Sequence, residues 1–386
     1  MNAVFIMDAS FPYGQAFSSR ARYFTKLLNL CGYHVHVIAQ HGSDTVCSDL
    51  EGADISVEYT NASDNALTLV GFGRAKPYIA ALKKYAEHND VDLIFSSSLT
   101  FVADRVLRFA KKHNVPYLIE QCEWYDASGF KYGKFNPYYR EHIKQITKKN
   151  KKCDGIVSIS RLLDEHYKAQ GARTIRIPTI LDTSLIPYRT NADDEKINIV
   201  FAGNPGRAKK ELMHPILSAI RMLGDDAKRL HLDIYGANRE QILYNIDADE
   251  ELLNSVSENV SIHGRVPQHT VEQKFRDADF SIFIRPQRRS SNAGFPTKLA
   301  ESMSVGTPVV TNDTGDISLY IKNGVNGIIA GGNSADDLYD AFRKILAMSL
   351  SEREAMRTAA RDTAEQSFDF RAYREQMLKL IKAIEG

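Results

Sequence analysis

The chain has 386 residues, of which 43% are hydrophobic and 25% are charged; this composition is typical of globular proteins and excludes a disordered or collagen-like chain. Two domains are expected, because a single hydrophobic core rarely extends beyond about 250–300 residues. The formal net charge is only +1, so no overall positive field attracts nucleic acid, and any anion site must be local.

The N-terminal residues and the cysteines indicate a cytoplasmic protein. Residues 1–14 lack a basic segment, and their apolar run ends at Asp8, which is too short for a signal peptide. No stretch approaches 18 apolar residues, so we expect no transmembrane helix. The four cysteines show neither the spacing of a zinc site nor a nearby histidine pair, and we expect them to be reduced.

Short apolar runs rich in β-forming residues alternate with helical patterns along the chain, which predicts βαβ units and parallel sheets. The first half contains five expected strands, at 3–7, 33–39, 91–97, 115–121 and 154–160. The second half contains another five, at 198–203, 230–236, 259–264, 280–284 and 307–311. The prediction is therefore an α/β protein with two Rossmann-like, doubly wound domains, whose ligands bind at the carboxyl ends of the strands.

Two further segments define the predicted domain organisation. Residues 181–196 are polar, contain a proline and follow neither hydrophobic period, which predicts a linker between the domains. Residues 367–384 carry an apolar stripe at helical spacing, so another surface must cover this C-terminal helix.

Two glycine-containing segments lack the residues that common nucleotide motifs require. VGFGRAKP (70–77) has a lysine where a dinucleotide fingerprint needs its third glycine. GNPGRAKK (203–210) lacks the second glycine and the final serine or threonine of a Walker loop. Neither segment is therefore a standard nucleotide-binding motif, and any local anion site must be formed in another way.

The segment after the expected strand 280–284 has the features of a ligand-facing helix N-terminus. Pro296 is suited to the first turn of a helix that ends at Gly306, and Gly294 leaves the backbone open to close approach. Free N–H groups around this turn and the helix dipole favour a phosphate, and the residues concerned are Phe295, Thr297 and Lys298. Glu301, one turn further, could accept hydrogen bonds from a ribose diol. The alternative is a simple tight turn between strand and helix.

A second loop between a strand and a helix, 203–211, supplies cations. Arg207 offers a planar guanidinium to diphosphate oxygens, and either Lys209 or Lys210 adds a point charge. The alternative for one of the two lysines is a solvated position at the start of the helix.

The order of these motifs resembles the donor domain of family 4 of the retaining glycosyltransferases, which have the GT-B fold. The motifs that carry the resemblance are GNPGRAKK, SIHGRVP (261–267), DADFSIFIRP (277–286), AGFPTKLAESMSVGTPVV (293–310) and IKNGVNGII (321–329). The first half agrees more loosely, through MDASFPYG, GYHVHVI and CDGIVSISRLLDEHYKAQG (153–171). The resemblance implies an acceptor-binding domain at 1–185, a donor-binding domain at 186–367, and a C-terminal helix, 368–386, that packs back on the first domain.

The resemblance also implies roles for individual residues. Glu301 matches the glutamate that holds the nucleotide ribose, and Arg207 and Lys210 match the cations on the donor diphosphate. The other positions implied to face the nucleotide sugar are Gly14, Gly203, Arg265, Gly294, Phe295, Thr297 and Lys298. One departure is Ala293, because the family usually has a glutamate there that touches the donor sugar.

A catalytic carboxylate is implied in the first domain. In IEQCEWYD (119–126), Glu123 matches the acidic position that the family places over the reacting sugar, and Cys122 falls on the preceding histidine position. The alternative is a loop carboxylate paired with a local lysine.

The predicted function is a retaining, metal-independent hexosyltransferase that needs no cofactor. It moves a sugar from a nucleotide diphosphate, with UDP as the first candidate, to a glycan or lipid-linked acceptor in surface polysaccharide or glycoconjugate biosynthesis. The alternatives are a nucleotide-sugar epimerase or hydrolase on the same fold, and a non-catalytic partner subunit, which Ala293 favours.

The segment 131–152 is the strongest charge asymmetry in the sequence. It contains eight basic residues and one acidic residue, a local net charge of +7, with Phe135, Tyr138 and Tyr139 interleaved. This pattern predicts contact with an anionic membrane, at the inner face of that membrane. The alternative is a solvated helix, and nucleic acid is not expected because no known binding module is present.

Overall fold

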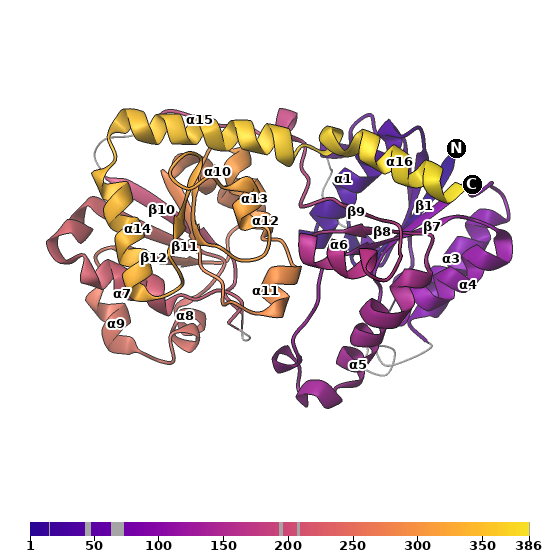
Figure 1. The fold of residues 1–386 in the computed structure, drawn as a ribbon, viewed down its shortest axis with the longest axis horizontal. Coiled ribbons are helices and arrows are strands. Elements are labelled where there is room, and N and C mark those ends of the chain that lie inside the picture. Colours follow the sequence, from indigo (N-terminus) through magenta and orange to yellow (C-terminus); the bar gives the residue numbers. More distant parts are fainter. Residues whose placement is uncertain (15, 43–47, 63–72, 193–195, 207–208, 386) are drawn as a thin grey trace. The chain divides into compact units, whose positions relative to one another are not determined.

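The computed structural model describes residues 1–386 except 15, 43–47, 63–72, 193–195, 207–208 and 386. The chain forms two compact units, shown in Figure 1. Unit 1 comprises Met1–Asp182, Ala293–Phe295 and Asp369–Gly386. Unit 2 comprises Thr183–Asn292 and Pro296–Phe368. Apart from the short segment Ala293–Phe295, the chain passes between the units at 182/183 and 368/369, where the sequence predicted 185/186 and 367/368.

Unit 1 contains a seven-stranded sheet in which every neighbouring pair is parallel. In spatial order the strands are β5 (Ile55–Tyr59), β3 (His34–Ala39), β1 (Asn2–Ile6), β6 (Leu93–Ser97), β7 (Tyr117–Gln121), β8 (Gly155–Ser158) and β9 (Thr174–Arg176). A separate small pair joins β2 (Ser10–Phe11) to β4 (His41–Gly42). The strand order reverses between β1 and β6, which is the switch point of a doubly wound sheet.

The helices of unit 1 include the C-terminal one, so both termini lie on this unit (Figure 1). The described helices are α1 (Ala16–Leu30), α3 (Ala75–Ala86), α4 (Ala103–His113), α5 (Pro137–Lys144), α6 (Arg161–Lys168) and α16 (Arg374–Glu385). The apolar stripe of α16 is buried through Met377, Leu380 and Ile381. Leu380 packs at Gly155 on β8, where a Cβ atom would lie 3.1 Å from its Cδ1. The C-terminal stripe is thus covered by the sheet of unit 1.

Unit 2 contains a six-stranded parallel sheet. Its strands in spatial order are β12 (Val260–Gly264), β11 (Leu230–Tyr235), β10 (Ile197–Ala202), β13 (Phe280–Phe283), β14 (Val309–Asn312) and β15 (Gly327–Ala330). Its described helices are α7 (His214–Met222), α8 (Arg239–Asn245), α9 (Glu250–Ser255), α10 (Gln268–Asp277), α11 (Arg289–Ala293, continuing into unit 1), α12 (Thr297–Ser304), α13 (Ile317–Tyr320), α14 (Ala335–Ala347) and α15 (Leu350–Ser367).

The sheet of unit 2 is buried on both faces. Along β10, Ile199 and Phe201 belong to the core that α7 and α14 cover, whereas Val200 and Ala202 belong to a second cluster on the other face, with Phe275 of α10. Burial on both faces explains the continuous apolar run at residues 199–202 of β10, since a parallel strand covered on both sides has no polar face. The expected α/β fold with two parallel sheets is confirmed.

All ten expected strands are present, each within two residues at either end. The strands that were not predicted from the sequence are β2, β4, β5, β9 and β15. The edge strands β5 and β9 contain no fully buried residue: all their residues are of intermediate exposure except Tyr59, which is exposed. Such strands need fewer apolar side chains, so their signal in the sequence is weak.

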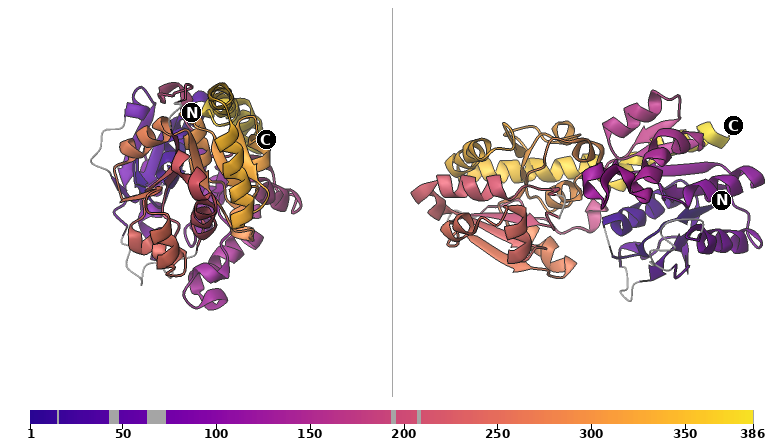
Figure 2. Two further views of the ribbon diagram at one scale, coloured as in Figure 1. Left: turned by 90° about the vertical axis from the view of Figure 1, so that its left-hand side faces the viewer. Right: turned by 90° about the horizontal axis from the view of Figure 1, so that it is seen from below.

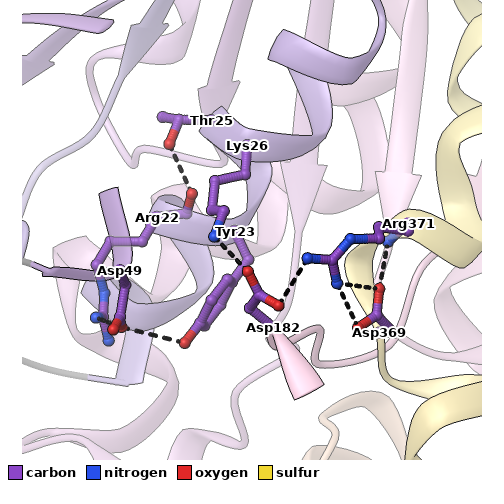
Figure 3. Close-up of polar contacts among 8 residues, drawn as sticks. All are labelled: Arg22, Tyr23, Thr25, Lys26, Asp49, Asp182, Asp369 and Arg371. Atoms are coloured by element: carbon purple, nitrogen blue, oxygen red, sulfur yellow. Dashed lines mark hydrogen bonds and ion pairs between the residues drawn. The ribbon is translucent and has the colours of Figure 1, made fainter. Parts of the chain in front are cut away.

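The two points where the chain leaves and re-enters unit 1 are joined by a charged cluster, shown in Figure 3. Asp182 accepts hydrogen bonds from Lys26 of α1 and from Arg371, at 2.9 Å for Arg371 Nη2. Arg371 also pairs with Asp369 at 2.8 Å. The Phe370 N–H donates to the carbonyl of Leu181 at 3.0 Å, so the outgoing and returning segments are hydrogen-bonded to each other.

Replacing Asp182 with asparagine is expected to lower the free energy of unfolding by about 1–2 kcal/mol, because a buried charged acceptor of two cations is lost. The Asp182 side chain is only 2% exposed, whereas Arg371 is 45% exposed and can rehydrate, which limits the loss. Urea unfolding followed by circular dichroism measures the change. Asp362→Asn, on the exposed face of α15, is the matched control. Equal stability of the two variants would show that the cluster contributes nothing to folding.

Candidate functional site

The strand order of unit 2 reverses between β10 and β13, so the carboxyl ends of these two strands form its switch point. Ligands of doubly wound sheets bind at this position, because the loops that follow the two strands diverge to opposite faces and leave a crevice. β10 leads into the loop 203–211, and β13 leads toward α12. The two segments that the sequence analysis selected therefore follow the two strands of the switch point.

A glycine turn at the end of β10 brings neighbouring loops into close contact. Gly203 has a φ of +143° and Gly236, after β11, has a φ of +88°. A Cβ atom at Gly236 would lie 3.0 Å from the carbonyl carbon and oxygen of Gly203, which is tighter than most Cβ contacts. The Gly203 N–H donates to the Tyr235 carbonyl at 2.8 Å, and the Gly236 N–H donates to the Gly264 carbonyl at 2.7 Å. The carboxyl ends of β10, β11 and β12 are therefore held together by backbone hydrogen bonds at glycines, with no side chain between them.

Lys298 of α12 places its ammonium group at this turn. Its Nζ atom lies 4.5 Å from the ring centre of Phe201 and 5.8 Å from that of Phe283, which are residues of β10 and β13. A Cβ atom at Gly203 would lie 2.9 Å from Lys298 Nζ, so the absence of a side chain there makes room for the ammonium. A cation therefore sits at the carboxyl ends of both switch-point strands.

Glu211 holds this cation in place. Its Oε2 atom lies 2.6 Å from Lys298 Nζ, and the two side chains are 11% and 15% exposed. The Glu211 carbonyl accepts from Asn245 Nδ2 at 2.9 Å, and Asn245 Oδ1 accepts from the Met213 N–H at 2.8 Å. Glu211 was not predicted from the sequence. The only sequence feature that could have indicated it is its position as a single acidic residue directly after two lysines, before an apolar helix.

Helix α12 carries the other candidates of this segment. Pro296 occupies the N-cap position, with φ −74° and ψ 108°, and not the first turn that the sequence predicted. Proline cannot cap through its side chain, so the N–H groups of Thr297 and Lys298 face the helix N-terminus without a capping side chain from that position. Glu301 is partly buried and lies three residues after Lys298, on the neighbouring part of the same helix face.

The two candidate lysines of the loop 203–211 differ in their contacts. Lys209 forms an ion pair with Asp247 and so is directed toward the turn between α8 and α9. Lys210 is exposed, and its N–H donates to the Pro205 carbonyl at 2.9 Å. Arg207 lies outside the described residues. The carbonyl of Lys209 accepts from Arg288 at 3.3 Å, which ties this loop to the segment after β13.

The structure brings together in unit 2 most of the residues that the sequence analysis assigned to the nucleotide. Arg265 is exposed and directly follows Gly264, whose carbonyl accepts from Gly236. The candidates that share this edge of unit 2 are Gly203, Lys210, Arg265, Thr297, Lys298 and Glu301. A cation, a helix N-terminus and a bare glycine backbone at one sheet edge are suited to a phosphate-containing ligand.

The remaining candidates lie in unit 1. Gly14 follows β2, and Glu123 follows β7 in a loop where its backbone carbonyl accepts from Gln121 Nε2 at 2.6 Å. Gly294 and Phe295 also group with unit 1, beside Ala293, whose carbonyl accepts from Ser160 Oγ at 2.7 Å.

The buried carboxylate at the end of β7 is Glu120, which the sequence analysis did not select. Glu120 is 1% exposed and pairs with Arg20, which also donates to the Ile177 carbonyl at 2.8 Å. Desolvation, with Glu120 alongside, raises the pKa of the Cys122 thiol well above its usual value. Cys122 therefore stays a neutral thiol and cannot replace the basic imidazole that the resemblance implies at this position. An acidic residue within an apolar strand usually has a buried partner, so the position of Glu120 in the run 115–121 could have predicted such a pair.

The described part of the chain contains no group of three or more histidine, cysteine, aspartate or glutamate residues arranged to hold a metal ion. Within the same residues, no helix is both long and apolar enough to cross a membrane.

Residues 185–363, which include the whole of this sheet edge in unit 2, match the family model described as "Glycosyl transferases group 1". The chain is also 27% identical over 128 residues to WcaL of Salmonella typhimurium, a protein assigned as a colanic acid biosynthesis glycosyltransferase. That match covers 32% of this chain and 31% of the relative, and the match to WcaL of Escherichia coli, at 23% identity, covers 43% of that relative. The chain thus aligns with less than half of the length of these relatives.

Solved structures match the fold over nearly the whole chain. Sucrose-phosphate synthase from Thermosynechococcus elongatus has a TM-score of 0.74 at 14% identity, covering 99% of this chain and 98% of the other. Anabaena HepE in complex with UDP and glucose has a TM-score of 0.67 at 14% identity, covering 99% of both chains. These matches confirm the GT-B fold, and the family match supports the resemblance to glycosyltransferases.

Proposed function

We propose that this protein is a glycosyltransferase that moves a sugar from a nucleotide diphosphate to a glycan or a lipid-linked acceptor. The observation that carries the proposal is the Lys298 ammonium, fixed by Glu211 at the carboxyl ends of β10 and β13 beside the N-terminus of α12. This cation lies within the residues that match the glycosyltransferase family. A diphosphate is the group that such a site would bind.

The proposed reaction retains the configuration of the sugar and needs no metal. Its transition state places negative charge on the leaving diphosphate, and the groups proposed to stabilise that charge are Arg207, Lys210, Lys298 and the N–H groups of α12. One cation at about 4 Å contributes at most about 4 kcal/mol before desolvation, and enzymes supply about 8–23 kcal/mol in total. Several cations could therefore provide much of the stabilisation that a metal ion provides in other transferases. Glu123 is proposed to act at the sugar.

The donor and the acceptor are proposed from the relatives. HepE binds UDP and UDP-glucose, which makes a UDP-sugar the first donor to test. WcaL is assigned to colanic acid biosynthesis, which favours a role in surface polysaccharide or glycoconjugate biosynthesis. We place the acceptor at the cytoplasmic face of an anionic membrane, which the protein reaches through 131–152.

A second candidate is a non-catalytic partner subunit. Ala293 stands where the resemblance implies a glutamate that touches the donor sugar, and alanine offers no side-chain acceptor for a sugar hydroxyl. Such a subunit would bind the nucleotide without transferring the sugar.

A thermal-shift screen against UDP, GDP, ADP, dTDP and CDP tests the proposal first. A nucleotide present at a hundred times its dissociation constant adds about 2.7 kcal/mol of stability, so a single base should stand out. Incubation with the matching nucleotide sugar, with and without acceptor, then separates transfer from acceptor-independent turnover and from no reaction. A protein that binds none of the five nucleotides would contradict the proposal.

Replacing Glu301 with glutamine is expected to weaken binding of the preferred nucleoside diphosphate about tenfold, because the amide loses one of the two acceptors proposed for the ribose hydroxyls. The unfolding transition should stay unchanged, since Glu301 is only partly buried. Isothermal titration calorimetry measures the affinity, with Asp362→Asn as a control of equal charge change. An affinity equal to that of the control would exclude Glu301 from the site.

A further inference from the structure

Two aromatic side chains project into solvent at the turn between β7 and α5. Tyr132 and Phe135 are each 72% exposed, more than any other large hydrophobic side chain among the described residues. Lys131 lies over the Tyr132 ring at 5.3 Å, and Lys134 lies over the Phe135 ring at 5.6 Å. We call residues 131–135 the aromatic turn.

The aromatic turn has a fixed conformation. Asn136 caps α5 by accepting from the Tyr138 and Tyr139 N–H groups at 2.9 and 3.2 Å, and its Nδ2 donates to the Lys131 carbonyl at 3.0 Å. Tyr132 has a φ of +70°, which is unfavourable for a bulky residue and is retained only where surrounding contacts impose it. The two exposed rings are therefore held outward at the cost of backbone strain.

A cluster of aromatic rings anchors the base of the turn. Phe130 packs against Tyr125, Tyr138 and Tyr139, with ring centres 5.7, 6.0 and 5.5 Å apart. These partly buried rings explain most of the aromatic content of this segment, and only Tyr132 and Phe135 remain outside the cluster. In Figures 1 and 2 this segment and α5 project from the rest of unit 1.

Three exposed cations are spaced along α5 and the π-helical turn that follows it, Gln145–Lys149. Arg140, Lys144 and Lys148 are exposed and four residues apart, which places them in one row along the helical segment, and we call them the basic stripe. Lys149 does not belong to it, because its ammonium pairs with Asp104 and Glu141. Glu141 is the only acidic residue of 131–152, so this internal ion pair leaves the basic stripe without an opposing carboxylate from its own segment.

We propose that the aromatic turn and the basic stripe form a docking surface for an anionic lipid bilayer. Tyr132 and Phe135 enter the interfacial layer, where aromatic rings are favoured, while the basic stripe and the two lysines of the turn contact acidic headgroups. Charge complementarity and the outward-held rings select this partner. The inference deepens the proposed function, since it places a lipid-linked acceptor beside unit 1, but lipid binding itself requires neither donor nor acceptor.

Vesicle co-sedimentation of the full chain tests the proposal, using phosphatidylcholine alone and phosphatidylcholine with 30% phosphatidylglycerol. We expect binding only to the anionic vesicles, and release at high salt because the charge attraction is screened. Replacing Arg140, Lys144 and Lys148 by glutamine should weaken binding about 100-fold, given roughly a fivefold contribution per basic residue. The matched control replaces Arg221, Lys322 and Lys344, three exposed cations of unit 2, and should bind like the unchanged protein.

The aromatic contribution is tested by combining Tyr132→Asn with Phe135→Ser. Asparagine tolerates the positive φ of Tyr132, so this variant should fold, and its circular dichroism spectrum and nucleotide affinity should match those of the unchanged protein. We expect about a tenfold loss of vesicle binding at low salt, and the same fold-loss at intermediate salt where the unchanged protein still binds, because ring burial is not screened.

Three results would overturn the proposal: equal binding by the stripe variant and its unit 2 control, equal binding by the aromatic variant and the unchanged protein, or binding to a single-stranded oligonucleotide that excludes the vesicles. The last result would assign the surface to nucleic acid. Nucleotide affinity is measured on the same samples, so a failure here would leave the proposed transferase function standing, and the reverse also holds.

Discussion

Replacing Lys298 with methionine is expected to lower the free energy of unfolding by about 3 kcal/mol, because the change leaves the Glu211 carboxylate buried without its cation. Glu211 is 11% exposed, and its backbone is fixed through Asn245, so its carboxylate cannot move freely into water. Urea unfolding gives the total loss. Hydrogen exchange of peptides from β10 and α12 locates the loss in unit 2.

A double-mutant cycle distinguishes the ion pair from the packing around it. Glu211→Leu alone should cost a similar amount, whereas Lys298→Met combined with Glu211→Leu should cost clearly less than the sum, because no unpaired charge remains. Both variants that lack Lys298 should also bind nucleoside diphosphate less tightly. Strictly additive losses would show that the two side chains do not interact.

Lys210→Ala and Arg207→Ala are expected to lower kcat about 100-fold each, because each removes a cation that is proposed to contact the diphosphate, and the diphosphate gains negative charge in the proposed transition state. Affinity for the intact donor should fall less than tenfold, because the same phosphates carry less charge before the bond breaks. Steady-state kinetics with the donor found in the nucleotide screen separate the two effects.

Lys209→Ala is the matched control for these variants. The Lys209 ammonium pairs with Asp247, so its removal should change kcat less than threefold, within the range of an exposed ion pair. A larger effect for Lys209→Ala than for Lys210→Ala would show that Lys209 leaves Asp247 during the reaction and that the assignment within this loop is off by one residue.

Glu120 and Glu123 lie three residues apart near the end of β7, but only Glu120 is buried. The sequence placed Glu123 in a loop after the strand 115–121, and Glu123 lies in the loop that follows β7. Sequence could not decide which carboxylate is buried, since the partner of Glu120 is Arg20, 100 residues earlier on α1. Only the packing of α1 beside β7 makes Glu120 a structural residue and leaves Glu123 in the loop.

The sequence by itself determined the α/β class, the ten principal strands and the apolar stripe of α16. Each of these depends on hydrophobic periodicity within a few neighbouring residues, which is a local property. Tertiary structure alone decided the pairing of Glu211 with Lys298, 87 residues apart, and of Asp182 with Arg371, 189 residues apart. Such pairs depend on strand order and on which segments a sheet brings side by side, and no local pattern of side chains encodes that order.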